Sequence, residues 1–287
     1  MLTVSLVLPM MQLKQKPTHS GKGVKAMTDV ADWWQTDIID MAPGQIRLRG
    51  FPIEDLIGNI GFAEMVWLMT RGTRPDKSQA ALLEAALVSA VDHGPQAPSI
   101  AAARMAVSCG LSLNNAMANA INMLGDVHGG AGEQAMQFFH DVKAQAVEMP
   151  LETAIKTVYQ ANNRLVPGFG HRFHKNADPR SLRLMTLLEA AVAANICDGG
   201  FAEIAVGVER FLADLKGKPI PMNVDGVTAV IYAELGFEPA LARGLFCLSR
   251  SVGALAHAHE QAGRKERNKG PTPPHYRWTY GGANPIK

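Results

Sequence analysis

Apolar residues recur along most of this chain at intervals of three and four, the spacing of amphipathic α-helices. Two such segments, 62–69 and 77–91, end at turns that contain glycine, and a run of small residues at 99–124 is broken at Cys109-Gly110. We expect the small residues to let helices pack closely. The helical period continues in residues 134–145, 151–162, 181–194, 201–215, 226–235 and 238–261.

The alternation of β-branched and polar residues that marks a half-buried strand is nearly absent from the chain. Segment 45–50, with the sequence Gln-Ile-Arg-Leu-Arg-Gly, is the one plausible strand, and we expect it in a small hairpin. No internal repeat is visible. The pattern therefore predicts an all-α fold.

Length and composition narrow the class of protein. At 287 residues the chain can bury a substantial core, as one large domain or two smaller ones. Its 47% hydrophobic and 19% charged residues are typical of a soluble globular protein. A formal net charge of +2 gives no reason to expect nucleic acid as a partner.

The N-terminal residues are interpreted as a leader. The apolar run at 2–8 is too short to span a bilayer, and no basic residue of a secretory signal precedes it. We expect residues 1–28 to be a disordered leader and the ordered part to begin near Asp29. The asparagines within 99–124 argue against a membrane span there, so no membrane association is predicted. Three isolated cysteines form no redox or metal pair, which is typical of a reduced cytoplasmic protein.

Three short segments place a residue suited to acid–base chemistry beside glycines, where the backbone leaves room for a substrate. Together they offer two imidazoles and one carboxylate, which is a catalytic constellation more than a packing pattern. The residues are His128, His171 and Asp225, in segments 125–131, 166–172 and 221–226.

Each of these residues has a second, structural interpretation. His128 precedes Gly129-Gly130 and a helix that starts near Glu133; a neutral imidazole there could donate to an oxyanion, or it could be an ordinary turn histidine. Asp225 precedes an apolar helix. A capping role would lower the pKa of its carboxyl group, whereas burial would raise that pKa towards a useful general base. The sequence leaves both alternatives open.

The surroundings of His171 favour an anionic ligand. The preceding Pro167-Gly168-Phe169-Gly170 is not a dinucleotide motif, but with the cations that follow it suits a phosphate-bearing ligand. Asp178-Pro179-Arg180 has the pattern of a helix N-cap. His171 and His174 have no glutamate partner at the zinc-protease spacing, so no metal site is predicted.

The C-terminal third adds one cation and one unusual tail. Arg250 falls in the middle of an apolar helix, and a partly buried cation needs an anionic partner. His257 and His259 point to different faces of that helix, and we expect them to be ordinary packing or surface residues. The tail from Arg264 is basic and then rich in proline, glycine and aromatic residues, which suggests an arm lying on another surface.

The order of these motifs resembles the citrate synthase superfamily from about Trp33 to the C-terminus. Each motif is modest alone, but the ordered set is specific. The segments that carry the resemblance are Arg47-Leu48-Arg49-Gly50-Phe51-Pro52-Ile53-Glu54-Asp55-Leu56, Val91-Asp92-His93, His128-Gly129-Gly130-Ala131, Gly168-Phe169-Gly170-His171-Arg172 with Asp178-Pro179-Arg180, Asn223-Val224-Asp225, and Leu248-Ser249-Arg250-Ser251 with Ala256-His257.

The resemblance implies a role for each matching residue. Asp225 would remove the methyl proton of acetyl-CoA, His128 would stabilise the enolate, and His171 would polarise the ketone of oxaloacetate. In the cleavage direction Asp225 would reprotonate the enolate and His171 would accept the hydroxyl proton. The implied carboxylate ligands are His93, Arg180 and Arg250, and the implied coenzyme A contacts are Val166, Pro167, Gly168, Phe169, Gly170 and Lys175.

The resemblance also implies an architecture. It is a helical homodimer, or a higher homo-oligomer, whose large domain (29–132 with 238–287) carries an inserted small domain (133–237). The active site would lie in the cleft between the domains and close by small-domain motion. No tightly bound cofactor is implied, because coenzyme A enters as a thioester substrate.

Two departures from the family decide among its members. The long helical stretch of full citrate synthases has no room between Gly50 and His93, so the chain is similar to the short members, citryl-CoA lyases and the citrate-synthase-like module of ATP-citrate lyase. The family's C-terminal Arg-Pro, which supplies an arginine across the dimer, has no clear counterpart, although Arg264 or Arg267 is a candidate.

The sequence therefore predicts a citryl-CoA lyase type enzyme that cleaves citryl-CoA to acetyl-CoA and oxaloacetate. A citrate synthase, or a 2-methylcitrate synthase-like enzyme, is the first alternative, because the motifs are shared. A family member that binds acyl-CoA without turnover is the second, and a metal hydrolase is a distant third.

Overall fold

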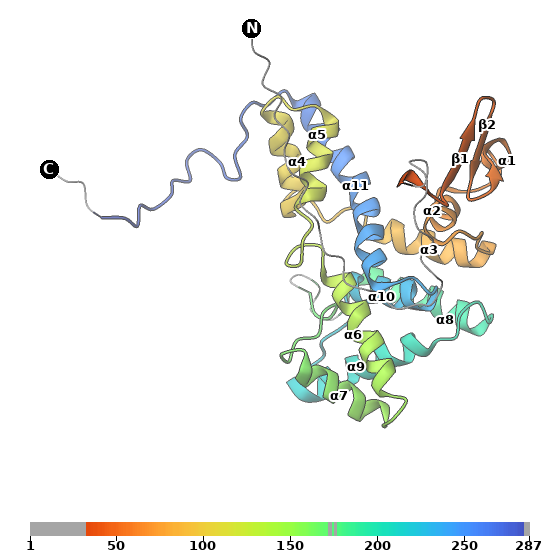
Figure 1. The fold of residues 1–287 in the computed structure, drawn as a ribbon. Coiled ribbons are helices and arrows are strands. Elements are labelled where there is room, and N and C mark those ends of the chain that lie inside the picture. Colours follow the sequence, from red (N-terminus) through yellow and green to blue (C-terminus); the bar gives the residue numbers. More distant parts are fainter. Residues whose placement is uncertain (1–32, 172–173, 175–176, 284–287) are drawn as a thin grey trace, which may run out of the picture.

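The computed structural model describes residues 33–171, 174 and 177–283. In this part of the chain helices dominate, and the predicted leader 1–28 and Lys175 lie outside it (Figure 1). The main helices are α2 (Phe62–Arg71), α3 (Lys77–Ser89), α4 (Pro98–Ser108), α5 (Leu113–Asn122), α6 (Ala131–Gln145), α7 (Leu151–Ala161), α8 (Pro179–Ala193), α9 (Gly200–Lys216), α10 (Val224–Glu234) and α11 (Pro239–Arg264).

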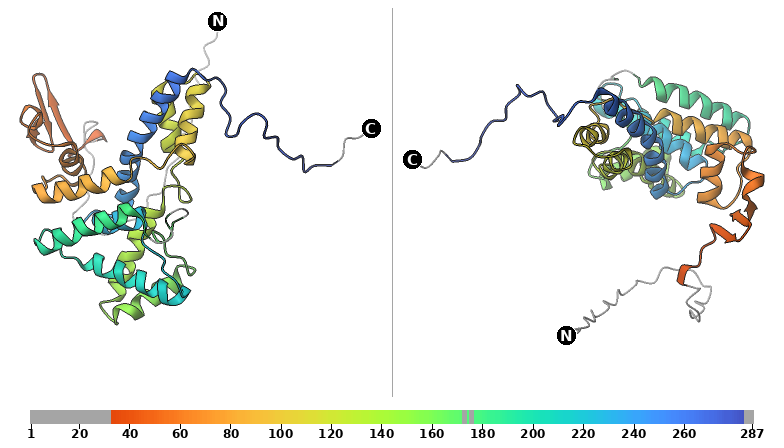
Figure 2. Two further views of the ribbon diagram at one scale, coloured as in Figure 1. Left: turned by 180° about the vertical axis from the view of Figure 1, so that it is seen from behind. Right: turned by 90° about the horizontal axis from the view of Figure 1, so that it is seen from above.

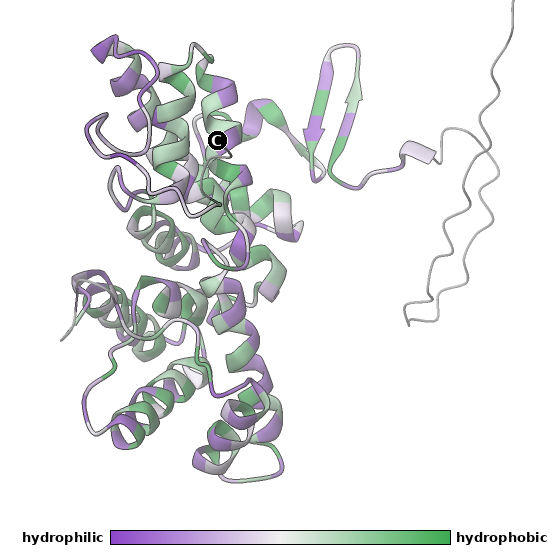
Figure 3. Ribbon diagram, turned by 90° about the vertical axis from the view of Figure 1, so that its left-hand side faces the viewer, coloured by the Kyte–Doolittle hydropathy of each residue, from purple (hydrophilic) through white to green (hydrophobic). Residues whose placement is uncertain are grey.

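The predicted helices are confirmed, with ends displaced by a few residues. Figure 3 shows hydrophobic and hydrophilic residues alternating around the helices, as expected for amphipathic segments. The expected break in the run of small residues separates α4 from α5, and Gly110 adopts a left-handed φ of 93° there. None of the helices described is long and apolar enough to cross a membrane.

A small antiparallel sheet stands beside the helices (Figure 1). Its strands β1 (Ile39–Ala42), β2 (Gln45–Leu48) and β3 (Phe51–Pro52) lie in the order β1-β2-β3, and β3 leads directly into the short helix α1 (Ile53–Leu56). The predicted hairpin is confirmed, but the expectation of a single strand is wrong. β1 was missed because all four of its residues are exposed, so no half-buried alternation marks it.

The larger hydrophobic core gathers residues from α2, α3 and α6–α11. α10 lies at its centre: nine of its 11 residues are buried, so it is apolar on every side. The same core includes the fully buried Phe139, Ile155 and Leu188. Because the first turn of α10 carries Asp225, this core fixes the position of that carboxylate.

A second core joins α4, α5 and α11, which run side by side (Figure 2). It consists mostly of alanines, and such small side chains let helix axes approach closely, as the sequence predicted. The predicted division into domains 29–132 with 238–287 and 133–237 stays a prediction. After α11 the chain first contacts the end of α4, where the backbone N–H groups of Asn268 and Lys269 donate to Ser108. It then leaves the helices as a segment with exposed Tyr276, Trp278 and Tyr280 (Figure 1).

Candidate active site

A cavity of about 540 Å³ collects all six predicted catalytic and carboxylate-binding residues. They come from six different places in the chain, and only the fold brings them together. His93 lies in the turn after α3, His128 before α6, His171 in the loop before α8, Arg180 in α8, Asp225 in α10 and Arg250 in α11.

Asp225 is not the cap of its helix. Asn223 caps α10, and its side-chain oxygen accepts the backbone N–H groups of Asp225 (3.0 Å) and Gly226 (3.2 Å). Burial raises the pKa of the Asp225 carboxyl group, and the nearby cations Arg250 and Arg180 only partly oppose the rise. Of the two alternatives left open by the sequence, the structure therefore has the buried carboxylate.

The glycine loop before His171 is fastened to the start of α10. The Gly170 N–H donates to the Pro221 carbonyl (2.7 Å), and the Asn223 N–H donates to the Gly168 carbonyl (2.9 Å). A Cβ on Gly226 would lie 2.3 Å from that carbonyl oxygen, so only glycine allows this approach. These contacts hold the His171 loop and the Asp225 turn together.

His171 is oriented by the loop that follows it. Its Nδ1 accepts the backbone N–H of His174 at 3.0 Å, so a neutral ring carries its proton on Nε2. The ring stacks on that of His174, with centroids 4.6 Å apart, and meets the His93 ring edge-on at 5.4 Å. A neutral His171 therefore has Nε2 as a hydrogen-bond donor.

His128 is oriented in the opposite sense. Its Nε2 accepts the backbone N–H of Ser99 (3.2 Å) and lies 3.0 Å from the Ser99 hydroxyl, so a neutral ring carries its proton on Nδ1. Burial and the charge of Arg250 lower the pKa of His128 and favour this neutral form. α6 begins three residues later, at Ala131, close to the predicted start.

The cations of the cavity are held in defined positions. Arg250 is only 4% exposed, its Nε donates to the Ala90 carbonyl (3.2 Å), and its guanidinium lies over the Phe246 ring. Burial lowers the pKa of Arg250, and the negative charges of Asp225 and Asp92 oppose this. These charges offset the burial only in part, so the expected anionic partner of Arg250 stays a prediction.

Arg180 forms an ion pair with the N-cap residue of its own helix. Asp178 caps α8 as predicted, and its carboxylate accepts both Nε (3.0 Å) and Nη2 (2.8 Å) of Arg180 in a forked pair. Burial works to raise the pKa of Asp178, but these hydrogen bonds outweigh it and lower the pKa. The pair fixes the guanidinium at the cavity wall.

Residues 69–273 match the family model described as "Citrate synthase, C-terminal domain". This protein belongs to the citrate synthase family. The resemblance inferred from the ordered motifs is confirmed.

Curated relatives in this family are named citrate synthases. That of Acidithiobacillus ferridurans is 31% identical over 76% of this chain and 55% of its own length, and that of Haloferax volcanii is 33% identical over 67% and 49%. The chain thus spans about half the length of the curated relatives it matches.

Solved structures include a shorter family member. Citryl-CoA lyase from Hydrogenobacter thermophilus matches with a TM-score of 0.79 and 33% identity, covering 88% of this chain and 96% of that one. Citrate synthase from Thermoplasma acidophilum, in complex with carboxymethyl coenzyme A and oxaloacetate, gives 0.62 and 25% identity over 79% and 59%. ATP citrate lyase from Methanothrix soehngenii, at 20% identity and a TM-score of 0.74, shares the fold. The all-α citrate synthase-like fold is confirmed.

The predicted coenzyme A contacts are only partly present in the cavity. Of the described ones, Val166, Pro167, Gly168, Phe169 and Gly170, only Gly170 lines the cavity, and the half-buried Phe169 ring packs edge-on against Phe139 of the core. Lys175 lies outside the described residues. Among the described residues, no cluster of three or more His, Cys, Asp or Glu side chains could hold a metal.

The sequence analysis did not single out several residues that form this cavity. Ser99 holds His128 from the first turn of α4, and Phe246 lies one turn before Arg250 beneath its guanidinium. The segment Pro95–Pro98 also lines the cavity. Phe246 lies one helical turn before Arg250, and this spacing could have indicated its contact with the arginine. No sequence signal links Ser99 to a histidine 29 residues later.

Proposed function

We propose that this protein is a citryl-CoA lyase type enzyme that cleaves citryl-CoA to acetyl-CoA and oxaloacetate. The observation that carries the proposal is the structural match: the TM-score is 0.79 at 33% identity for the Hydrogenobacter thermophilus citryl-CoA lyase, but 0.62 at 25% identity for the Thermoplasma acidophilum citrate synthase. The cavity adds support, since it holds one carboxylate and two imidazoles whose neutral tautomers are defined.

The carboxylate is suited to move a proton to and from carbon. In cleavage the bond between the thioester methylene and the hydroxyl-bearing carbon breaks, and its electron pair passes into the enolate of acetyl-CoA. Protonated Asp225 then returns a proton to the methylene carbon. Because burial raises the pKa of Asp225, more of the side chain is protonated at a given pH than in an exposed aspartic acid, so the proton is there to be given to carbon. In the reverse direction the carboxylate is a stronger base.

The two imidazoles are suited to the two oxygens that change charge. His128 carries its proton on Nδ1 when neutral and would donate it to the enolate oxygen. His171 carries its proton on Nε2 when neutral and would donate to the ketone oxygen during condensation. In cleavage the hydroxyl proton would pass to Nε2 of His171. This step requires the other neutral tautomer, with the ring proton on Nδ1 and the hydrogen bond from the His174 N–H released, and the imidazolium that forms then donates to the ketone oxygen.

The remaining cavity residues suit a dicarboxylate. Arg180 and Arg250 present guanidinium groups, which bind carboxylates with two parallel hydrogen bonds. His93 completes the set. Burial, together with the charges of Arg180, His171 and Arg250, lowers the pKa of His93, so a neutral donor is favoured. In the same scheme the backbone of 166–170 and Lys175 would hold coenzyme A.

Product analysis tests the proposal directly. The purified protein is given citryl-CoA, or acetyl-CoA with oxaloacetate, and the products are separated by chromatography. Acetyl-CoA and oxaloacetate formed from citryl-CoA without free citrate would support the lyase. An Asp225→Asn variant, whose amide can neither give nor take the proton, should lose about 10²-fold or more in turnover with an unchanged circular dichroism spectrum. Near-wild-type turnover in this variant would contradict the role of Asp225.

Citrate synthase is the second candidate, because the curated relatives at 31–33% identity carry that name. Free citrate and coenzyme A released from either mixture would establish it, with a 2-methylcitrate synthase-like activity indicated if propionyl-CoA is the better substrate. Binding of acyl-CoA without any turnover would indicate a non-catalytic member.

We also propose that the protein forms a homodimer through α11 and its neighbours. Leu248, Val252 and Leu255 recur at helical spacing and are 43%, 57% and 41% exposed, an apolar stripe that a second copy would cover. The mass of the protein in solution, measured by light scattering, tests this, and Val252→Asp should shift the mass towards the monomer. A monomeric wild-type protein would refute it.

A further inference from the structure

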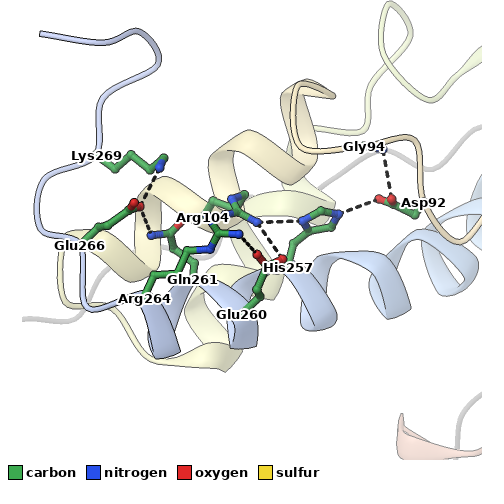
Figure 4. Close-up of polar contacts among 9 residues, drawn as sticks. All are labelled: Asp92, Gly94, Arg104, His257, Glu260, Gln261, Arg264, Glu266 and Lys269. Atoms are coloured by element: carbon green, nitrogen blue, oxygen red, sulfur yellow. Dashed lines mark hydrogen bonds and ion pairs between the residues drawn. The ribbon is translucent and has the colours of Figure 1, made fainter.

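A chain of polar side chains joins α4, α11 and the turn that carries His93 (Figure 4). Arg104 of α4 lies with Nη1 3.0 Å from Nδ1 of His257 in α11, and Nε2 of His257 lies 3.3 Å from Oδ1 of Asp92. Asp92 Oδ2 in turn accepts the backbone N–H of Gly94 at 3.1 Å. We propose that His257 is a positioning residue, which acts through Asp92 to hold His93 in the dicarboxylate site.

The partners of His257 fix the direction of its hydrogen bonds. A guanidinium can only donate, so Nδ1 of His257 accepts from Arg104, and a neutral ring then donates from Nε2 to Asp92. Arg104 is 8% exposed and is also paired with Glu260 of α11 (3.3 Å), so its own position is defined. Both ring nitrogens of His257 are therefore used in a single orientation.

Asp92 fastens the turn on both sides of His93. One carboxylate oxygen receives His257 and the other receives the Gly94 N–H, so the residue between them is held at both ends. Burial works to raise the pKa of Asp92, but the hydrogen bonds from Gly94 and His257 outweigh it and lower the pKa. Gly94 adopts a left-handed φ of 86°, which gives the turn its shape.

α11 also grips the segment just before this turn. A Cβ on Gly253 would lie 2.2 Å from the Val91 carbonyl oxygen, and Arg250 Nε donates to the Ala90 carbonyl. Arg250, Gly253 and His257 follow one another at helical spacing, so one face of α11 holds residues 90–92. Since Arg250 lines the cavity, the contact through His257 sets the distance between His93 and that arginine.

His257 does not line the cavity, so its effect on a ligand must pass through Asp92. This separates it from His259 of the same helix, which is exposed and has none of these contacts among the interactions described. The sequence interpretation placed both histidines in one class, as packing or surface residues; the structure distinguishes them.

The experiment is a double-mutant cycle on oxaloacetate binding, measured by calorimetry, and it rests on the proposed function. His257→Leu should weaken oxaloacetate binding about 10-fold, the scale of a lost hydrogen bond to a charged group, and leave acetyl-CoA binding unchanged. In a His93→Ala background the same substitution should have no further effect. His257→Gln should recover most of the affinity, because an amide can accept from Arg104 and donate to Asp92. His259→Leu is the matched control.

A second measurement needs no ligand. The ring signals of ¹⁵N-labelled histidines are recorded by NMR, with the His93 signal assigned from His93→Ala. His257→Leu should shift the His93 signal and His259→Leu should not. The measurement also covers the case in which the wild-type protein binds no oxaloacetate, which would count against the proposed function and not against this inference.

The outcomes are separable. Wild-type oxaloacetate affinity in His257→Leu, or a loss that simply adds to that of His93→Ala, would overturn the positioning role and leave the proposed function standing. If oxaloacetate binds to none of the proteins, an unchanged His93 signal in His257→Leu would overturn it too, and a shifted signal would support it.

Discussion

The close backbone approach beside Asp225 offers a sharp test of how the site is built. Gly226 lies in the first turn of α10, beside Asp225, and a Cβ added there would be 2.3 Å from the Gly168 carbonyl oxygen and 2.6 Å from the Met222 side chain. An ordinary contact between carbon and oxygen is about 3.3 Å, so Gly226→Ala must move the two backbones apart by about 1 Å. The displaced carbonyl also accepts the Asn223 N–H, so this bond lengthens as well.

This shift separates the His171 loop from Asp225. Misplacement of reacting groups by about 1 Å can cost about 10²-fold in rate, and overpacking typically costs about 1–3 kcal/mol in stability. We therefore expect Gly226→Ala to lose about 10²-fold in kcat/KM on citryl-CoA and about 1–3 kcal/mol in the free energy of unfolding.

The assay compares this variant with a matched helix glycine. Gly244 lies in α11 with nothing within 4 Å of an added Cβ, so Gly244→Ala should keep its activity and gain about 0.5–1 kcal/mol from helix propensity. Turnover is measured by product chromatography and stability by urea unfolding. If Gly226→Ala were as active as Gly244→Ala, the argument that this contact sets the catalytic geometry would be refuted.

Two further predictions concern carboxylates at the site. The pKa of Asp225 is raised in the folded protein, so the stability that this group contributes is present below the unfolded pKa of about 4. This stability is lost as the pH rises through the folded pKa. Asp225→Asn should therefore be more stable than the wild type at about pH 7, and this advantage should fade near pH 4. Urea unfolding at both pH values checks this, and a constant difference would contradict the burial argument. Asp178→Asn should keep the cap of α8 but weaken the forked pair with Arg180, and this should raise the KM for oxaloacetate about 10-fold. Asp178→Ala should also lose the cap, which costs about 1 kcal/mol of stability. Steady-state kinetics and thermal melts separate the two effects, and an unchanged KM in Asp178→Asn would show that the pair does not position Arg180.

Local pattern was enough for most of the secondary structure. The period of apolar residues located helices such as α6 and α9 within a few residues, because the buried face of an amphipathic helix repeats apolar residues at a spacing of three and four. Strand β1 was missed for the converse reason, since it buries no face. The ordered motifs also identified the family, and the glycines beside His128, His171 and Asp225 marked the parts of the chain that meet in the cavity.

Only the tertiary structure decided how the side chains of the site are oriented and which of their atoms carry protons. The sequence left Asp225 as either a cap or a buried carboxylate, and the choice depends on Asn223 taking the cap and on the burial of the first turn of α10 by the surrounding helices. The tautomer of His128 depends on Ser99, and the part played by His257 depends on Arg104 and Asp92. These partners are far apart in the chain, and hydrogen bonds between such groups carry no periodic signature. The sequence by itself determined which residues could react; packing of distant helices determined which atom of each faces which partner.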